Sequence, residues 1–130
     1  MHRFWLLVAV LLAGTAVFEV RSASAQSLLG IWTISNNAIN ACPGKLQINN
    51  GDERSGHYDG VASFQCDSQS VTELFSISVS NGKIIMEGHN PSGPWCADDY
   101  TLRLNGAGAM EGDSRDGCGT EGTVSMAKTR

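Results

Sequence analysis

The stretch that decides the fold runs from Cys42 to Cys66 and reads CPGKLQINNGDERSGHYDGVASFQC. It begins and ends with a cysteine, and polar and apolar residues alternate on both sides of an Asn-Gly pair. The stretch from Cys96 to Cys118 repeats this plan, with an alternating run and an Asn-Gly pair of its own. Alternation with a period of two is typical of a β-strand that buries one face. The sequence therefore predicts two hairpins, each bracketed by a pair of cysteines.

The four cysteines are expected to form two disulfides, since an even number in a small exported domain is typical of a disulfide framework. Three pairings are possible. We favour Cys42–Cys66 with Cys96–Cys118, because each pair then encloses one hairpin. A zinc site is the alternative, but the chain has no pair of cysteines separated by two residues, which zinc sites commonly use.

The first 25 residues have the features of a secretory signal peptide. A basic start at 1–3 precedes an apolar run at 4–18, and Ala-Ser-Ala at 23–25 supplies a cleavage pattern. The run is shorter than the roughly 20 apolar residues that a transmembrane helix needs. We therefore predict cleavage after Ala25, a single domain over 26–130, and an exported protein, periplasmic or extracellular, without a membrane span in its mature form.

The charge of the mature chain argues against two classes of partner. Removing Arg3, Glu19 and Arg21 with the signal peptide leaves seven basic and twelve acidic residues, a net charge of −5. An acidic chain with scattered lysines and arginines lacks the basic patch that binds nucleic acid. It also lacks a basic amphipathic segment for an anionic membrane surface.

Eight short alternating runs follow one another after the signal peptide, with turn residues between them. They cover residues 30–35, 45–49, 57–65, 72–80, 83–88, 99–104, 109–113 and 120–128. Eight strands can close on themselves and remove both sheet edges. We therefore predict an all-β fold, a small eight-stranded antiparallel up-and-down barrel stapled by disulfides, with a two-sheet β-sandwich as the alternative.

The alternation also predicts which side chains fill the interior. The expected inward set is Trp32, Ile34, Leu46, Ile48, Tyr58, Ala62, Phe64, Phe75, Ile77, Val79, Ile84, Met86, Tyr100, Leu102, Leu104, Met110, Val124 and Met126. An eight-stranded barrel has an interior that side chains can just fill. We therefore expect a mostly filled core that is open at one end at most.

Sequence motifs that are typical of catalytic sites are weak in this chain. The chain has no Gly-x-Ser-x-Gly elbow. Asp98 and Asp99 are adjacent, but neighbours on a strand point to opposite faces, so we interpret them as solvated charges at a strand entrance. An enzyme would need a convergent cluster, such as His57 and Asp59 with His89 and Asp98, that the spacing does not indicate. We predict a non-enzymatic protein.

Metal-binding patterns are equally weak, and we predict neither a metal site nor a cofactor. His57 and His89 lack the His-x-His or His-x3-His spacing of metal sites, and we interpret them as exposed loop residues. The segment EGDSRDG at 111–117 resembles a calcium loop only faintly, because it lacks the ligand order and the distal glutamate.

The connection from His89 to Asp99, HNPSGPWCADD, is the best candidate for recognition. Two prolines stiffen it, Cys96 fixes it to the body, and Trp95 lies there outside any alternating run. A rigid loop that presents an aromatic side chain is a common recognition device. The alternative is that Trp95 folds over the open end of the barrel and seals the core.

The run LGIWTIS at 29–35, followed by Cys42, resembles the first strand of the lipocalin and avidin superfamily and of the small periplasmic barrel inhibitors of bacterial metalloproteases. The resemblance rests on Gly30-Ile31-Trp32 and implies a barrel in which Trp32 is a floor residue. The chain departs from these families in its second cysteine pair and in lacking the later lipocalin motifs. It also lacks avidin's series of tryptophans, so biotin is not implied.

Two binding functions follow as expectations. In the first, the loop around Trp95 binds a protein partner. If that partner is an exported hydrolase, this protein would act as its inhibitor. In the second, the barrel mouth carries a small apolar or aromatic ligand, lined by Tyr58, Phe64, Trp95 and Tyr100. The candidate binding residues are Trp95, Tyr100, Tyr58 and His89. A cavity above about 300 Å³ would favour the second function.

Overall fold

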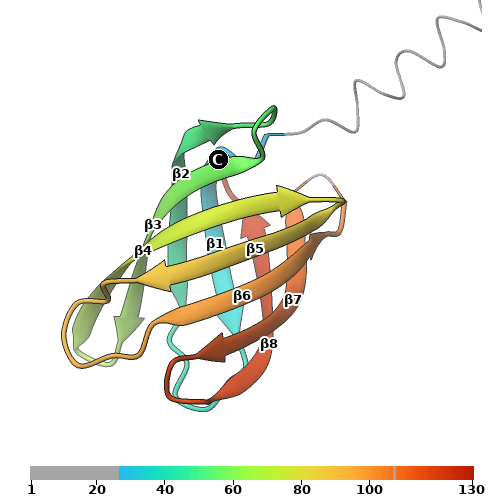
Figure 1. Cartoon of the computed structure of the whole chain (residues 1–130). Helices are drawn as coiled ribbons and strands as arrows, with labels where there is room; N and C mark the ends of the chain where they lie inside the picture. Colours follow the sequence, from blue (N-terminus) through green and yellow to red (C-terminus); the bar gives the residue numbers. More distant parts are fainter. Residues whose placement is uncertain (1–26, 107) are drawn as a thin grey trace, which may run out of the picture.

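The computed structural model describes residues 27–106 and 108–130, so the predicted signal peptide at 1–25 lies outside the described residues. The described chain forms eight antiparallel strands that close into a barrel (Figure 1). The strands are β1 (Gly30–Asn36), β2 (Gly44–Asp52), β3 (His57–Cys66), β4 (Gln69–Ser80), β5 (Lys83–His89), β6 (Asp98–Leu104), β7 (Ala109–Asp116) and β8 (Glu121–Lys128). The predicted barrel is confirmed, and the sandwich alternative is wrong.

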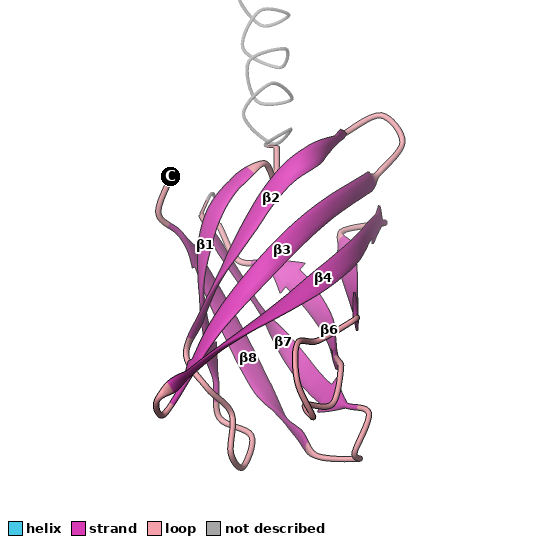
Figure 2. Cartoon of the chain, turned by 90° about the vertical axis from the view of Figure 1, so that its left-hand side faces the viewer, coloured by secondary structure: helices cyan, strands magenta, loops and turns pink. Residues whose placement is uncertain are grey.

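Each strand pairs with the next in the chain, and β1 pairs with β8 to close the barrel. The closing register runs from Trp32 opposite Lys128 to Asn36 opposite Val124. Figure 2 shows the strongly tilted strands that such closure requires. The β4–β5 connection is the expected two-residue turn, with positive φ at Asn81 (53°) and Gly82 (76°).

Inward-facing residues of all eight strands form one core, as the alternation predicts. Sixteen of the eighteen side chains in the expected inward set are buried. Leu104 is a correction, because it is 42% exposed at the last position of β6, beyond the packed interior. Val79 is half-buried near the end of β4 and packs against the core. Alternation assigns a residue to a face, but a strand end can extend past the core on that face.

The two ends of the barrel differ. At the end where β1 begins, here called the far end, buried Trp32 donates a hydrogen bond from Nε1 to the carbonyl oxygen of Leu28 (2.9 Å). The other end, called the mouth, carries the β1–β2, β3–β4, β5–β6 and β7–β8 connections. These lie at the lower left of Figure 1, opposite the C-terminus.

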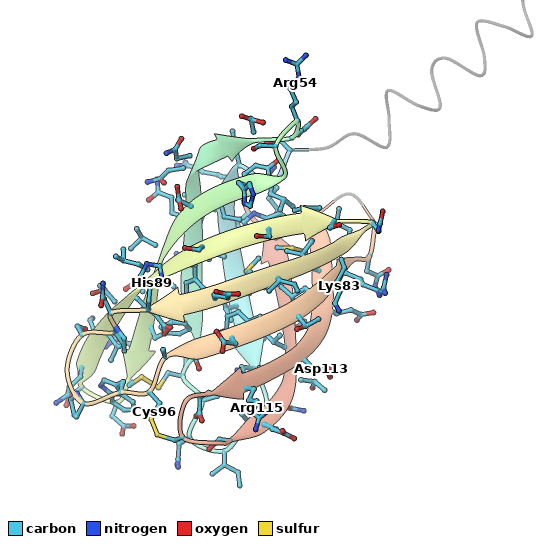
Figure 3. All side chains as sticks on the ribbon, in the orientation of Figure 1. Arg54, Lys83, His89, Cys96, Asp113 and Arg115 are labelled. Carbon is cyan, nitrogen blue, oxygen red and sulfur yellow. A yellow bond between two sulfur atoms is a disulfide. The ribbon has the colours of Figure 1, made fainter. Side chains whose placement is uncertain are left out.

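Both disulfides are at the mouth, and both have the predicted pairing. Cys42–Cys66 joins the β1–β2 connection to the end of β3, and Cys96–Cys118 joins the β5–β6 and β7–β8 connections (Figure 3). Such bridges are typical of proteins that fold in an oxidising, exported environment. Within the described residues, no helix has the length and hydrophobicity needed to cross a membrane.

Candidate functional site

A cavity of about 250 Å³ opens at the mouth. It is lined by the ends of strands and by three of the four mouth connections, and all four cysteines are on its wall. Its larger aromatic and aliphatic side chains are Phe64, Val71, Trp95, Tyr100 and Ile39, and its polar ones include Asn36, Glu73, Asp98, Ser114 and Asp116. An apolar hollow with a few inward polar groups is the usual form of a small-molecule site.

A second hollow, of about 550 Å³, lies along β1, β7 and β8. Most of its lining side chains are hydroxyls, amides and the carboxylates of Glu111 and Asp113, and none is aromatic. Although its volume is larger, Val124 supplies the single apolar side chain in its lining, and no ring is available to pack against a ligand. The mouth cavity is therefore the better candidate site.

Glu73 is the central polar side chain of the mouth, and it is only 2% exposed. Positions 71, 73, 75 and 77 of β4 share the inward face, so Glu73 points into the barrel between Val71 and Phe75. Gly88 on β5 makes room for it, because a Cβ there would collide with the Glu73 carboxyl group and with the Asp98 carbonyl oxygen. The Asp98 amide donates a hydrogen bond to Glu73 Oε2 (3.0 Å).

The carboxyl groups of Glu73 and Asp98 form a pair. Burial raises the pKa of Glu73 to about 8, and Asp98 and Asp99 add to this shift through their charges, while the Asp98 amide opposes it. The pKa of Asp98 is also raised, first by burial and then by the charges of Asp116 and Asp99, although its hydrogen bond with Glu73 favours ionisation. Glu73 therefore carries the proton at neutral pH. The pair can donate or accept a hydrogen bond, or offset a positive charge.

Tyr100 forms part of the floor of the cavity. Its ring stacks on Phe75, with centroids 5.5 Å apart. Burial raises the pKa of its phenol, the charges of Asp98 and Glu73 raise it further, and the side chain of Asn36 lowers it. Asn36 is itself held in place, because its Oδ1 accepts hydrogen bonds from the Ala38 amide (2.9 Å) and the Ser114 hydroxyl (3.1 Å). The floor thus presents a neutral phenol within a fixed polar network.

Asp116 has a structural role at the rim. Its Oδ1 accepts hydrogen bonds from the amides of Cys118 (3.0 Å) and Thr120 (2.8 Å) and so shapes the β7–β8 turn. Local bonds of this kind are the usual role of aspartate in turns. Its negative charge still faces Asp98.

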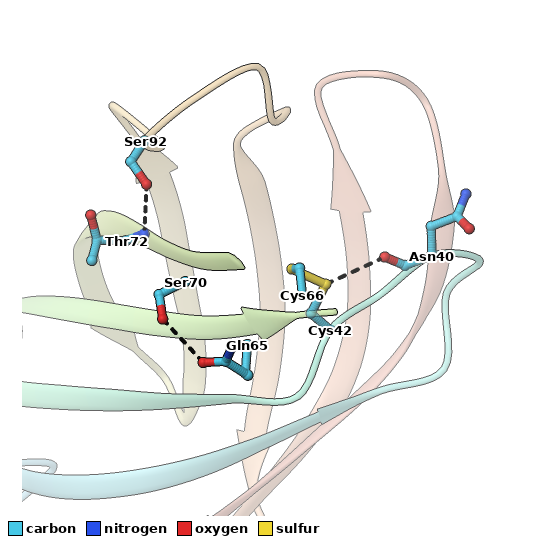
Figure 4. The surroundings of a disulfide bond; sticks show 7 residues. All are labelled: Asn40, Cys42, Gln65, Cys66, Ser70, Thr72 and Ser92. Atoms are coloured by element: carbon cyan, nitrogen blue, oxygen red, sulfur yellow. Dashed lines mark hydrogen bonds between the residues drawn. A yellow bond between two sulfur atoms is a disulfide. The ribbon is translucent and has the colours of Figure 1, made fainter. Parts of the chain in front are cut away.

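The connection between β5 and β6 is fixed at several points. Ser92 exchanges two hydrogen bonds with Thr72 on β4, each 2.9 Å long (Figure 4). Nearer its end, the Ala97 carbonyl oxygen accepts a bond from the Gly117 amide (2.9 Å), beside the Cys96 disulfide. Trp95 lies between these anchors and is 38% exposed. The loop therefore holds an aromatic ring at the rim, partly on the cavity and partly in solvent.

Of the four candidate binding residues, the structure brings two together. Trp95 and Tyr100 both line the mouth cavity, as does Phe64. Tyr58 faces inward but at the far end, where it pairs in register with Gly51 and Ile77. His89 is exposed on the outer face at the end of β5, opposite Leu74. Alternation gives the face of each residue, whereas its height along the barrel depends on the register.

The interpretation of Asp98 as a solvated charge is wrong. Asp98 and Asp99 do point to opposite faces, as expected, but Asp98 is half-buried on the cavity wall while Asp99 is exposed. His57 and Asp59 are exposed on the outer face of β3 and do not converge with Asp98. Among the described residues, no group of three or more histidine, cysteine, aspartate or glutamate side chains is arranged to hold a metal ion.

The main residue that sequence reasoning missed is Glu73. It lies two positions before Phe75, so the alternation of β4 places it on the inward face. A glutamate at an inward position between apolar residues is itself the signal, because buried carboxyl groups are rare and costly. Ser114 escaped notice because β7 continues to Asp116, three residues beyond the predicted end.

Comparison with known proteins supports the fold alone. No protein-family model matches the chain, and no curated protein matches it. A solved structure described as a redesigned beta barrel, b11L5F_LGL, superimposes with a TM-score of 0.70. It is 13% identical, and the match covers 79% of this chain and 92% of that one. At this identity the likeness carries no function, and the lipocalin-like resemblance stays a prediction.

Proposed function

We propose that this protein is an exported, non-enzymatic binding protein that takes up a small molecule in the mouth cavity. The observation that carries the proposal is the combination of aromatic walls with a buried carboxyl pair in one cavity. A well-packed barrel end would be more stable with apolar side chains, since a buried carboxyl group costs free energy. Its presence beside an open hollow is explained by a ligand.

The two disulfides support the same proposal. One fastens the β1–β2 connection to β3 and the other joins the β5–β6 and β7–β8 connections, so that the cavity wall is held in one arrangement before a ligand arrives. Preorganisation of this kind reduces the entropy lost on binding. The cavity, at about 250 Å³, lies just below the usual range of ligand sites, about 300–1,000 Å³. The ligand is therefore expected to be smaller than a typical drug.

The test is to block the cavity and measure binding. Val71→Phe places a larger ring in the cavity wall, and Val79→Phe makes the same change on the same strand and face at the far end. Small aromatic compounds such as indole, phenol and phenethylamine are titrated into the labelled mature protein and followed by NMR. We expect amide shifts around the mouth, abolished by Val71→Phe and retained by Val79→Phe. Shifts confined to the outer wall would contradict the proposal.

A protein partner is the second candidate, and the rim favours it. Ile39 is 79% exposed beside the cavity, and Trp95 is 38% exposed across from the same hollow. Exposed apolar residues at a rigid rim are suited to recognition. If an exported hydrolase is the partner, the mature protein will inhibit a metalloprotease such as thermolysin in a casein assay, and Ile39→Asp will remove the inhibition. Unchanged proteolysis would leave the small molecule as the occupant.

A further inference from the structure

We infer that the occupant of the mouth cavity is a small organic cation, an amine carrying an aromatic or aliphatic group, with its charge against Glu73 and Asp98. This inference rests on the small-molecule binding proposed above and specifies the class of ligand. It is carried by three features of the cavity: its ionisable side chains are acidic, an acid stands at position 73 where the fold needs only a hydrogen-bond acceptor, and its walls are aromatic and aliphatic.

The cavity is lined by acidic side chains without basic ones among them. Glu73, Asp98 and Asp116 line it, and no lysine, arginine or histidine of the described chain does. Within residues 27–106 and 108–130, the one ion pair joins Arg115 to Glu121 (3.8 Å), and both side chains are 70% exposed. Among the residues that the structure describes, the carboxyl groups of the mouth thus have no cationic partner. An anionic ligand would be repelled there, and a cation would be attracted.

The fold needs a hydrogen-bond acceptor at position 73, but it does not need an acid there. Asp116 forms a turn, but Glu73 accepts one amide hydrogen bond and otherwise faces Asp98 at 2% exposure. Gly88 on one side and Ala62, its register partner on β3, leave space for its carboxyl group. A hydrocarbon side chain at position 73 would leave the Asp98 amide without its acceptor, but a neutral glutamine would keep an acceptor there without the cost of burying an acid. A buried carboxyl group that faces a cavity without a counter-charge is therefore poised for a ligand.

The walls suit the rest of such a molecule. The rings of Phe64, Trp95 and Tyr100 line the cavity together with Val71. Aromatic rings attract cations through their π-electrons and also pack well against apolar groups. A ligand with an ammonium group at the carboxyl pair and a hydrocarbon part toward Trp95 would satisfy both parts of the cavity.

Binding of a cation should also release a proton from Glu73. Glu73 holds a proton at neutral pH, because burial and the charges of Asp98 and Asp99 raise its pKa to about 8. The groups that face it from neighbouring strands are Asp98 and Tyr100 on β6 and Asp116 on β7. An ammonium group nearby favours the carboxylate and so releases the proton. A neutral ligand of the same shape would release none.

The experiment compares phenethylamine with 2-phenylethanol, which has the same hydrocarbon part and a hydroxyl in place of the ammonium. Calorimetry on the mature protein is repeated in buffers of different ionisation enthalpy to count protons. We expect the amine to bind at least about tenfold more tightly than the alcohol, an energy difference of about 1.4 kcal/mol. We also expect proton release for the amine alone.

Two variants identify the groups responsible. Glu73→Gln and Asp98→Asn keep the side-chain shape but cannot become carboxylates, so each should weaken the amine about tenfold or more and leave the alcohol within about threefold. Glu87→Gln, on the exposed face of β5, is the matched control and should change neither.

The outcomes separate this inference from the proposed function. If the alcohol binds as tightly as the amine, or if Glu73→Gln does not affect the amine, the cation inference is wrong and small-molecule binding stands. If neither compound binds at millimolar concentration, the proposed function fails as well. If calcium binds in place of the amine and Glu73→Gln abolishes its binding, the organic cation is replaced by a metal ion.

Discussion

At the scale of single residues, the mouth is distinguished by an acidic side chain at a buried, inward position that apolar residues usually occupy. Glu73 occupies an inward position of β4 between Val71 and Phe75, and it keeps its proton because it is buried beside Asp98. Gly88 is its structural counterpart, since only a residue without a Cβ leaves space for that carboxyl group. Both residues give predictions about stability that do not depend on a ligand.

The first prediction concerns pH. The pKa of Glu73 is about 8 in the folded protein, so the group keeps its proton up to about that pH, whereas the unfolded chain releases it near the ordinary pKa of about 4.5. Because the folded state binds more protons in this window, the free energy of unfolding should fall as the pH rises through it. In Glu73→Gln this contribution disappears. Urea denaturation at several pH values should therefore show a flatter profile for Glu73→Gln, with a growing advantage over the wild type toward pH 8.

The control for this prediction is Glu87→Gln, which removes an exposed carboxylate from the outer face of β5. It should keep the slope of the wild type. Parallel profiles for wild type and Glu73→Gln would show that Glu73 titrates normally in the folded state, contrary to our description of the pair.

The second prediction concerns Gly88→Ala. The added methyl group would meet the Glu73 carboxyl group and the Asp98 carbonyl oxygen (2.5 Å), so the pair must move. Such overpacking usually costs about 1–3 kcal/mol. Gly108→Ala is the control, because its nearest neighbour would be Lys128 Cβ at 3.7 Å. Chemical denaturation should show a clear loss for the first variant and little change for the second, and equal effects would contradict the assigned contact.

At the scale of elements, the β5–β6 connection decides how Trp95 is used. Ser92 and Cys96 anchor the loop on either side of the tryptophan, to β4 and to the β7–β8 connection. The backbone of the loop is therefore held without help from the ring itself. This arrangement favours recognition over a plug, the alternative that the sequence left open.

The third prediction follows from this comparison. Trp95→Ala should lower the free energy of unfolding by about 1–2 kcal/mol, as for an ordinary substitution, because the ring is 38% exposed. Trp32→Ala removes a ring that is 1% exposed and hydrogen-bonded to Leu28, and should cost about 3–5 kcal/mol. Thermal and urea denaturation measure both. If Trp95→Ala is as damaging as Trp32→Ala, the ring is a structural plug.

At the scale of the whole molecule, the sequence predicts the barrel well because local signals agree with closure. Alternating runs, the Asn81-Gly82 turn and hairpins bracketed by cysteines all indicate neighbouring antiparallel strands. The composition of the mouth could not be read in the same way. Alternation separates inside from outside, but it does not say that Tyr100 is at the mouth and Tyr58 at the far end, since this depends on the register of all strands.

The fourth prediction concerns the disulfides, which connect distant parts of the chain at one end of the barrel. Each bridge closes a loop of 22 to 24 residues in sequence separation. In the chain-entropy model a loop of this size contributes roughly 3.5 kcal/mol. Replacing either pair by alanines should therefore lower the free energy of unfolding by about 3 kcal/mol. It should also weaken ligand binding in the fraction that stays folded, and unchanged binding would show that the mouth is rigid without its bridges.

The most direct test of the central claim uses the four valines of the described chain, which lie in different places. Val71 lines the mouth cavity, Val79 lies at the far end, Val124 is in the core and Val61 is on the outer wall. In mature protein with labelled valine methyl groups, intermolecular NOEs to bound phenethylamine report its position. The structure predicts NOEs to Val71 and none to Val61 or Val79. NOEs to Val61, or their absence at Val71 under saturation, would contradict a ligand site at the mouth.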